Sequence, residues 1–137
     1  MSTWALVPIK PRALCKTRLA SVLAPAQRLA LVRSMLGHVL ATLRATPAIR
    51  HIALVTSERD EVADDVLRLD DCGGDLNAGL ESAVSHAFAA GASTVLILPA
   101  DLPLVCVRDV REMLRAARRT GIAIAPDRHE SGTNAVC

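Results

Sequence analysis

The chain has 137 residues, of which 51% are hydrophobic, yet it contains one Trp, one Phe and no Tyr. This length fits a single domain, residues 1–137, with a core of aliphatic side chains. With so few aromatic rings and a net charge of +2, the chain is expected neither to stack the bases of single-stranded nucleic acid nor to bind a duplex.

The four cysteines, at positions 15, 72, 106 and 137, show neither the spacing of a zinc site nor that of a disulfide framework. Pro8, Lys10 and Pro11 interrupt the apolar start of the chain, so it does not have the pattern of a signal peptide. No apolar run is long enough to cross a membrane. We therefore expect a soluble, cytoplasmic protein without a membrane partner.

In chain order, the sequence predicts a strand at Trp4–Ile9, a helix from Pro25 to Pro47, a strand at His51–Thr56, a short polar helix at Glu58–Asp65, a strand at Val66–Leu69, a helix at Ala78–Ala90, a strand at Thr94–Leu98, a helix at Asp109–Arg119 and a strand at Ile122–Ala125. The first helix should bury one apolar face, formed by Leu29, Val32, Leu36, Val39 and Leu43. A polar loop follows at Asp127–Thr133, and Ala135–Cys137 has the pattern of a further strand. This alternation predicts an α/β fold, a three-layer sandwich around a mostly parallel sheet.

Asp101 is the most informative candidate for chemistry. It follows the apolar run Thr94–Leu98, which predicts a fully buried strand, and it lies between Pro99 and Pro103. The prolines restrict the backbone, and the carboxyl end of such a strand is where open α/β sheets bind ligands. An aspartate there is suited to holding a divalent metal against a phosphate, although it could also simply cap the turn.

The loop after the first predicted strand is basic, with Lys10, Arg12, Lys16 and Arg18. Cations at this position of an α/β fold can neutralise a polyphosphate. The loop has no glycine, so it is neither a Walker A loop nor a dinucleotide fingerprint. On these residues alone, a phosphate site and a solvated basic loop are equally compatible.

Two later segments, Gly73–Leu80 and Asp127–Asn134, could also face a ligand. In the first, the glycines permit close backbone approach, and Asn77 could cap a helix or contact a base or ribose. In the second, hydroxyl, amide and backbone N–H groups could hold an anionic acceptor while Asp127 assists a metal. His129 by itself is more typical of a surface residue, and neither a catalytic triad nor a pair of glycosidase carboxylates is present.

Four segments carry a family resemblance: VPIKPRALCKTRLA, GGDLNAGL, LPADLPLV and APDRHESGTNAV. In this order and spacing they resemble the 2-phospho-L-lactate guanylyltransferase family of deazaflavin (coenzyme F-420) biosynthesis, which includes phosphoenolpyruvate and 3-phosphoglycerate guanylyltransferases. The resemblance implies a Rossmann-like fold of the nucleotide-diphospho-sugar transferase type, close to molybdopterin guanylyltransferases. It also implies transfer of GMP from GTP to a phosphorylated C3 carboxylate, with release of pyrophosphate.

The resemblance further assigns roles to residues of this chain. Lys10, Lys16 and Asp101 are implied as catalytic, and Asp101 as the ligand of Mg²⁺. The implied nucleotide-binding residues are Pro8, Lys10, Lys16, Arg18, Asn77 and Gly79. Thr133 and Asn134 are the implied acceptor-binding residues. The partners implied are GTP and a small phosphorylated carboxylate, and a homodimer remains open.

Three departures from the family pattern stand out. Cys15 replaces a usual alanine, Glu130-Ser131 replaces a Gly-Thr pair, and the chain lacks the C-terminal part of the family domain. The sequence leaves the acceptor undetermined. It also leaves three alternatives: a different nucleotidyltransferase, a truncated and inactive nucleotide-binding remnant, and a regulatory α/β module. Against a molybdopterin guanylyltransferase, the glycine-rich first loop of those enzymes is absent.

Overall fold

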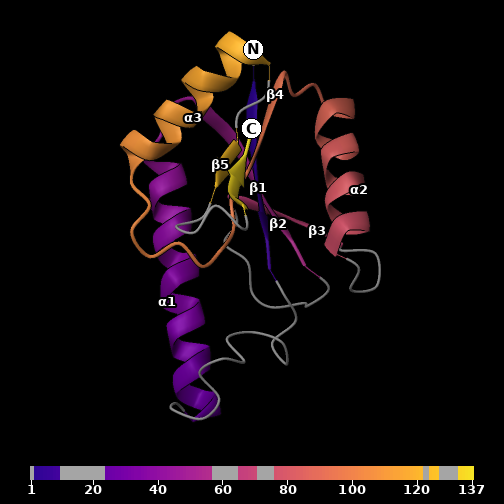
Figure 1. Ribbon diagram of the computed structural model, residues 1–137. Coiled ribbons are helices and arrows are strands. Elements are labelled where there is room, and N and C mark those ends of the chain that lie inside the picture. Colours follow the sequence, from indigo (N-terminus) through magenta and orange to yellow (C-terminus); the bar gives the residue numbers. More distant parts are fainter. Residues whose placement is uncertain (1, 10–23, 57–64, 71–75, 122–123, 127–132) are drawn as a thin grey trace.

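The computed structural model describes residues 2–9, 24–56, 65–70, 76–121, 124–126 and 133–137 (Figure 1). In chain order the elements are β1 (Thr3–Pro8), α1 (Pro25–Arg44), β2 (Ile49–Val55), β3 (Val66–Leu69), α2 (Leu76–Ala89), β4 (Thr94–Ile97), α3 (Val107–Thr120), β5 (Ile124–Pro126) and β6 (Thr133–Val136). Apart from Asp65, which lies in a turn, the predicted helix at Glu58–Asp65 is outside the described residues.

The strands form a six-stranded sheet in the order β3-β2-β1-β4-β6-β5. β3, β2, β1 and β4 are parallel neighbours, with Leu6 of β1 opposite both Ala53 of β2 and Ile97 of β4. β6 runs antiparallel to β4 and β5, and it pairs Val136 with Ile97. The prediction of a mostly parallel sheet is therefore confirmed.

Side chains alternate between the two faces of the sheet and so build a three-layer sandwich. On one face, Ala5 and Val7 of β1 pack with Val39 of α1 and Val110 of α3 in the main core cluster. On the other face, Leu6 packs in a second cluster with residues of β2 and α2, namely Ala53, Val55 and Ala83. Figure 1 shows α1 and α3 on one side of the sheet and α2 on the other.

Glycine ends α3, and a glycine follows the end of α2. Gly91 has φ +103° and donates its N–H to the carbonyl of Phe88, while Gly121 has φ +84° and bonds to Ala117. Only glycine adopts this backbone region without strain, so both chain reversals are encoded locally. At the start of α1, Pro25 occupies the first turn and Gln27 reaches back to accept the N–H of Ala24 at 2.8 Å.

The sequence overestimates how completely two elements are buried. Leu96 of β4 and Leu98 just after it are buried, but Val95 and Ile97, which pack on the other face against the cluster shared by β1, β2 and α2, are only partly buried. In α1, Val39 and Leu43 are fully buried, whereas Leu29 and Val32 in its first half are only partly covered by the protein. Figure 1 shows why: the first half of α1 extends past the ends of the strands.

Several element boundaries differ from the predictions by a few residues. α2 begins at Leu76 rather than Ala78, and β5 covers Ile124–Pro126. Thr133 belongs to strand β6 rather than to a polar loop, because its backbone pairs with Pro126 of β5. Among the described residues, no helix has the length and apolar character needed to cross a membrane.

Candidate functional site

The candidate site lies at the carboxyl edge of the parallel strands. β1 and β4 are adjacent and in register, so Pro8 and the segment after Ile97 leave the sheet at the same edge. α2 follows β3, which is parallel to both, so its first turn with Asn77 and Gly79 opens at this edge as well (Figure 1). The topology therefore brings together predicted residues that are far apart in the sequence.

Asp101 is exposed on a segment, Leu98–Val105, that is held at both ends. At its start, the N–H of Leu98 donates to the carbonyl of Leu6 at 3.0 Å, which extends the pairing with β1. At its end, Nε2–H of His38 donates to the carbonyl of Val105 at 2.6 Å. Between these points Leu102 packs against the main core cluster. The carboxylate is thus exposed on a segment that is anchored on both sides.

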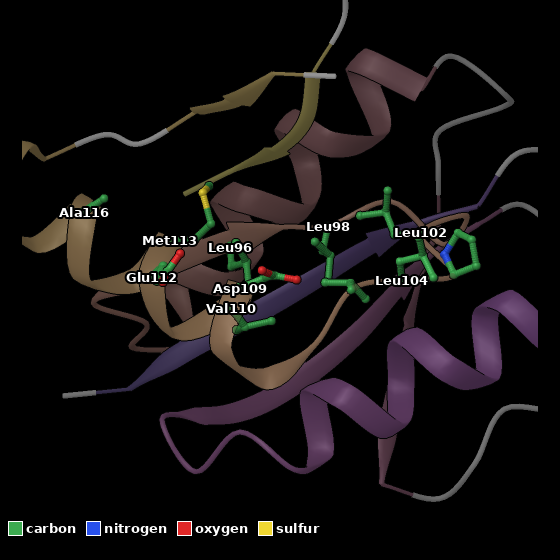
Figure 2. A pocket seen from close by; sticks show the side chains of 11 residues that line it. Leu96, Leu98, Leu102, Leu104, Asp109, Val110, Glu112, Met113 and Ala116 are labelled. Carbon is green, nitrogen blue, oxygen red and sulfur yellow. The ribbon is translucent and has the colours of Figure 1, made fainter. Parts of the chain in front are cut away.

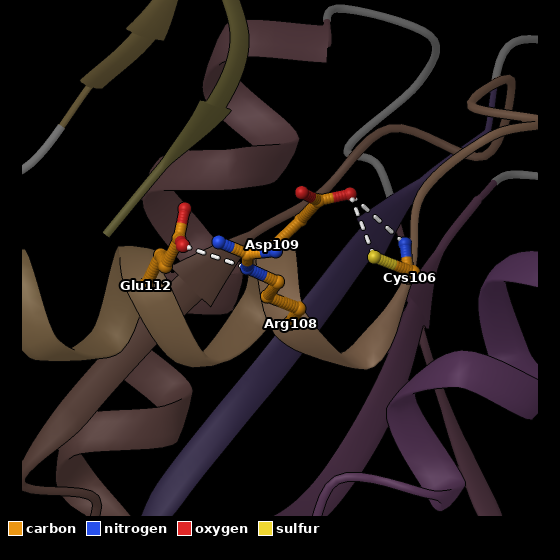
Figure 3. Close-up of polar contacts among 4 residues, drawn as sticks. All are labelled: Cys106, Arg108, Asp109 and Glu112. Carbon is orange, nitrogen blue, oxygen red and sulfur yellow. Dashed lines mark hydrogen bonds and ion pairs between the residues drawn. The ribbon is translucent and has the colours of Figure 1, made fainter.

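A helix cap fixes the chain immediately after this segment. The carboxylate of Asp109 accepts the backbone N–H of Cys106 at 3.0 Å and its thiol at 3.3 Å (Figure 3). An acidic side chain in the first turn of α3 also suits the positive end of the helix dipole. On the same helix, Arg108 in the first turn and Glu112 one turn later form an exposed ion pair at 3.2 Å. This cap fixes the point at which the Leu98–Val105 segment ends and α3 begins.

The predicted acceptor-binding residues, Thr133 and Asn134, also reach this edge. β6 is antiparallel to β4 and pairs Val136 with Ile97, so its first residues lie beyond the carboxyl end of β4. The backbone of Thr133 is therefore on the same side of the sheet as the Asp101 segment. The side chains of Thr133 and Asn134, and all of Asp127, lie outside the described residues.

The nucleotide-binding predictions have mixed outcomes. Asn77 is exposed in the first turn of α2 and Gly79 is buried there, so Asn77 is inside the helix and is not its N-cap. The earlier start of the helix explains this correction. Lys10, Lys16 and Arg18 lie outside the described residues, and their phosphate-binding role stays a prediction.

Sequence reasoning missed three residues that bear on this edge. His38 and Thr42, one turn apart on α1, both contact the carbonyl of Val105, Thr42 Oγ1 at 3.5 Å. Nothing in the sequence signals this contact, since it joins positions 67 and 63 residues apart. The third is Arg28, whose Nε is buried without a hydrogen-bond partner among the described residues. It lies near the start of α1, at the end of the helix that extends past the strands.

The described residues contain no cluster of three or more His, Cys, Asp or Glu side chains that could enclose a metal. Asp101 is the carboxylate that the Leu98–Val105 segment presents at the edge. Magnesium in nucleotide-dependent enzymes is commonly held by one or two carboxylates, with phosphates and water completing the octahedron. An exposed carboxylate at this edge therefore fits a metal that arrives with a nucleotide.

Known proteins share both the sequence and the fold. The family described as guanylyl transferase, CofC-like, matches residues 3–137. A phosphoenolpyruvate guanylyltransferase of Sphaerobacter thermophilus is 40% identical over 98% of this chain and 67% of its own length. A 2-phospho-L-lactate guanylyltransferase of Methanothrix thermoacetophila is 37% identical over 96% of this chain and 58% of its own length.

The fold is shared with a crystal structure of a nucleotide-diphospho-sugar transferase from Desulfovibrio desulfuricans, described there as putative. The TM-score is 0.83 at 23% identity, over 99% of this chain and 63% of that one. The expected nucleotide-diphospho-sugar transferase fold is therefore confirmed. The chain spans about two thirds or less of the length of these proteins. With the family match covering nearly every residue, the chain belongs to the CofC-like guanylyltransferase family.

Proposed function

We propose that this chain forms the nucleotide- and metal-binding part of a guanylyltransferase of coenzyme F-420 biosynthesis. The proposed reaction transfers GMP from GTP to the phosphate of 2-phospho-L-lactate, phosphoenolpyruvate or 3-phosphoglycerate, in the cytoplasm. The observation that carries the proposal is the anchored Asp101 at the carboxyl edge, on the same side of the sheet as Asn77 and the end of β1. The activities named for the relatives support the same class of reaction.

In the proposed reaction, a phosphate oxygen of the acceptor attacks the α-phosphorus of GTP in line with the leaving group. The new P–O bond forms as the bond between the α-phosphorus and the bridging oxygen breaks, and pyrophosphate leaves with that oxygen. An acceptor phosphate is already ionised near neutral pH, so the step needs positioning and charge neutralisation more than a general base.

The predicted site residues have different roles in the proposed reaction. Asp101 would hold Mg²⁺, which neutralises charge on the α-phosphate when bound. Lys10, Lys16 and Arg18 would stabilise the leaving pyrophosphate, and Pro8, Asn77 and Gly79 would contact the nucleotide. Thr133 and Asn134 would bind the acceptor. His38 acts at a distance from this chemistry by holding the Asp101 segment against α1.

Two measurements on the purified chain test the proposal. Calorimetry with GTP in the presence and absence of Mg²⁺ measures binding, and pyrophosphate release with each of the three acceptors measures turnover. Magnesium-dependent GTP binding supports the proposed nucleotide- and metal-binding role, and turnover with an acceptor shows in addition that this chain carries out the transfer by itself. Binding without turnover supports a nucleotide-binding part that is inactive on its own. Tighter binding of CTP than of GTP would indicate a different nucleotidyltransferase, and binding of neither nucleotide refutes the proposal.

Asp101→Asn is the informative variant, and Glu112→Gln is its matched control. Both replace an exposed carboxylate by an amide, but Glu112 lies on α3 in a pair with Arg108. The first change should abolish the magnesium dependence of GTP binding, and the control should leave it unchanged. If GTP binding depends equally on magnesium in the wild type and in Asp101→Asn, Asp101 does not hold the metal.

A further inference from the structure

The apolar groove between β4 and α3 does not suit an anionic ligand. It has a volume of about 630 Å³ (Figure 2). Its lining includes the carboxylates of Asp109 and Glu112, and no Lys, Arg or His side chain of the described residues. The charged part of a nucleotide is therefore expected at the carboxyl edge of the sheet, where a described cation has no role in the site so far.

This cation is Arg28, in the first turn of α1. Its backbone N–H donates to the carbonyl of Ala24 at 3.0 Å, which is the first turn of hydrogen bonding in the helix. α1 connects β1 to β2 and packs on both strands in the main core cluster. Because the first half of α1 extends past the strands (Figure 1), Arg28 belongs to the part of the helix that lies beyond their carboxyl ends.

The charge of Arg28 is unfavourable where it stands. The N-terminal end of a helix carries a positive partial charge, which favours acidic residues and disfavours basic ones. The first turn of α1 contains no acidic residue, and the N-cap residue, Ala24, forms no side-chain hydrogen bond. In the sequence, residues 10–23 include four basic residues and no Asp or Glu. Arg28 therefore adds a positive charge next to charge of the same sign.

The guanidinium of Arg28 also lacks an acceptor. The residue is half-buried, and its Nε is fully buried without a hydrogen-bond partner among the described residues. The ion pairs formed within the described part of the chain join other arginines, Arg44 to Asp65 and Arg108 to Glu112. A buried donor without an acceptor costs stability, and in native proteins such a group is typical of a functional position.

The topology places Arg28 with the nucleotide rather than with the acceptor. The predicted acceptor-binding residues, Thr133 and Asn134, belong to β6, and β4 separates β6 from β1 in the sheet. α1 instead follows the basic segment, residues 10–23, whose Lys10, Lys16 and Arg18 are proposed to stabilise pyrophosphate. Asp101 follows β4 directly, whereas α1 reaches further out from the strands. Arg28 is therefore on the side expected for the phosphates beyond the metal.

We propose that Arg28 is a further phosphate-binding residue, which binds the β- and γ-phosphates of the nucleotide. The inference rests on the proposed guanylyltransferase function. Nε–H and one Nη–H of a guanidinium can donate side by side to two phosphate oxygens, which supplies the acceptor and the negative charge that Arg28 lacks. As the bond to the α-phosphorus breaks, the bridging oxygen keeps the electron pair, and Arg28 stabilises the charge that develops on the leaving pyrophosphate.

Calorimetry with GTP, GMP and pyrophosphate, each with Mg²⁺, tests this assignment. Arg28→Met keeps an unbranched side chain but removes the charge and the Nε–H. It should weaken GTP and pyrophosphate about tenfold or more, and GMP less than about twofold, because GMP has no β- or γ-phosphate. Arg33→Met is the matched control, since Arg33 is exposed on the same helix, and it should leave all three affinities unchanged.

The stability of the ligand-free protein separates ligand binding from a role in the fold. Arg28→Met should leave the urea midpoint unchanged or raise it, because it removes a buried donor without an acceptor and a charge at the positive end of α1. Arg28→Lys, which keeps the charge but not the paired N–H groups, should bind pyrophosphate with intermediate affinity. A lower midpoint, with all three ligands weakened equally, would assign Arg28 to the fold and overturn the inference.

Two further outcomes distinguish this inference from the proposed function. If the wild type binds GTP with magnesium and Arg28→Met binds GTP and pyrophosphate equally well, the role of Arg28 is refuted and the proposed function stands. If Arg28→Met weakens phosphoenolpyruvate but not pyrophosphate, Arg28 binds the acceptor, which also overturns the inference. A wild type that binds neither GTP nor pyrophosphate refutes both.

Discussion

Replacing His38 with alanine tests whether the Asp101 segment is anchored as described. The change removes the donor of the 2.6 Å hydrogen bond to the carbonyl of Val105. The imidazole is exposed, so little apolar burial is lost with it. The carbonyl keeps a weaker donor, Thr42 Oγ1 at 3.5 Å. The expected cost is that of one net hydrogen bond, about 0.5–1.5 kcal/mol, which corresponds to about a two- to tenfold change in the opening equilibrium of the segment.

Hydrogen exchange measures this opening directly. In His38→Ala, the amides of Asp101, Leu102, Leu104 and Val105 should exchange about two- to tenfold faster, while those of β1 and β2 change only with global stability. Thr42→Val, which preserves shape and removes both the 3.5 Å contact with Val105 and the 2.9 Å bond to the carbonyl of His38 within α1, should have a smaller effect on the segment. Restoration by His38→Gln, whose amide can also donate, would show that the donor matters. Unchanged exchange of residues 101–105 in His38→Ala would refute the anchoring role of His38.

The remaining predictions concern stability and thiol chemistry. Leu43→Ala, at a fully buried position, should lower the free energy of unfolding by about 2–5 kcal/mol in urea denaturation, whereas Leu31→Ala, at a position 36% exposed, should cost much less; similar costs would contradict the packing of α1. The hydrogen bonds from Arg44 lower the pKa of Asp65 below its ordinary 3.8, so the pair stabilises the fold above that pH and loses its effect as the pH falls through the lowered pKa. Asp65→Asn should therefore lower the urea midpoint at pH 7 but not at a pH where Asp65 is protonated, and an equal loss at both would exclude the ion pair as the cause. Burial raises the pKa of the Cys137 thiol, so alkylation of Cys137, followed by mass spectrometry, should accelerate as the pH rises beyond the range of an ordinary thiol; saturation at the ordinary pKa would contradict its burial.

The alternation of strands and helices was predictable because its signals are local. Apolar runs such as His51–Thr56, Pro25 at a helix start and Gly91 after a helix each act within a few residues. The carboxyl-edge position of Asp101 followed from the same pattern, since a parallel sheet fixes where each strand ends.

Burial and long-range contacts could be predicted less well from the sequence. The apolar pattern of Thr94–Leu98 is continuous, but burial of Val95 and Ile97 depends on what covers their face of the sheet, which is a property of the whole fold. The bond between His38 and Val105 joins a helix to a distant segment and leaves no periodic signal. Likewise, the local sequence predicts Thr133 in a polar loop, whereas its backbone pairing with Pro126 places it in a strand.

We propose that the carboxyl edge of the parallel strands binds a metal–nucleotide complex through Asp101. Titration with Mn²⁺·GTP and amide NMR tests this claim most directly, because paramagnetic Mn²⁺ replaces Mg²⁺ and broadens nearby resonances. We expect selective broadening of the amides of Ile9, Asn77 and Asp101, with Thr3 and Ser93 at the opposite edge unaffected, and loss of this pattern in Asp101→Asn. Broadening centred elsewhere, or the same pattern in Asp101→Asn, would contradict it.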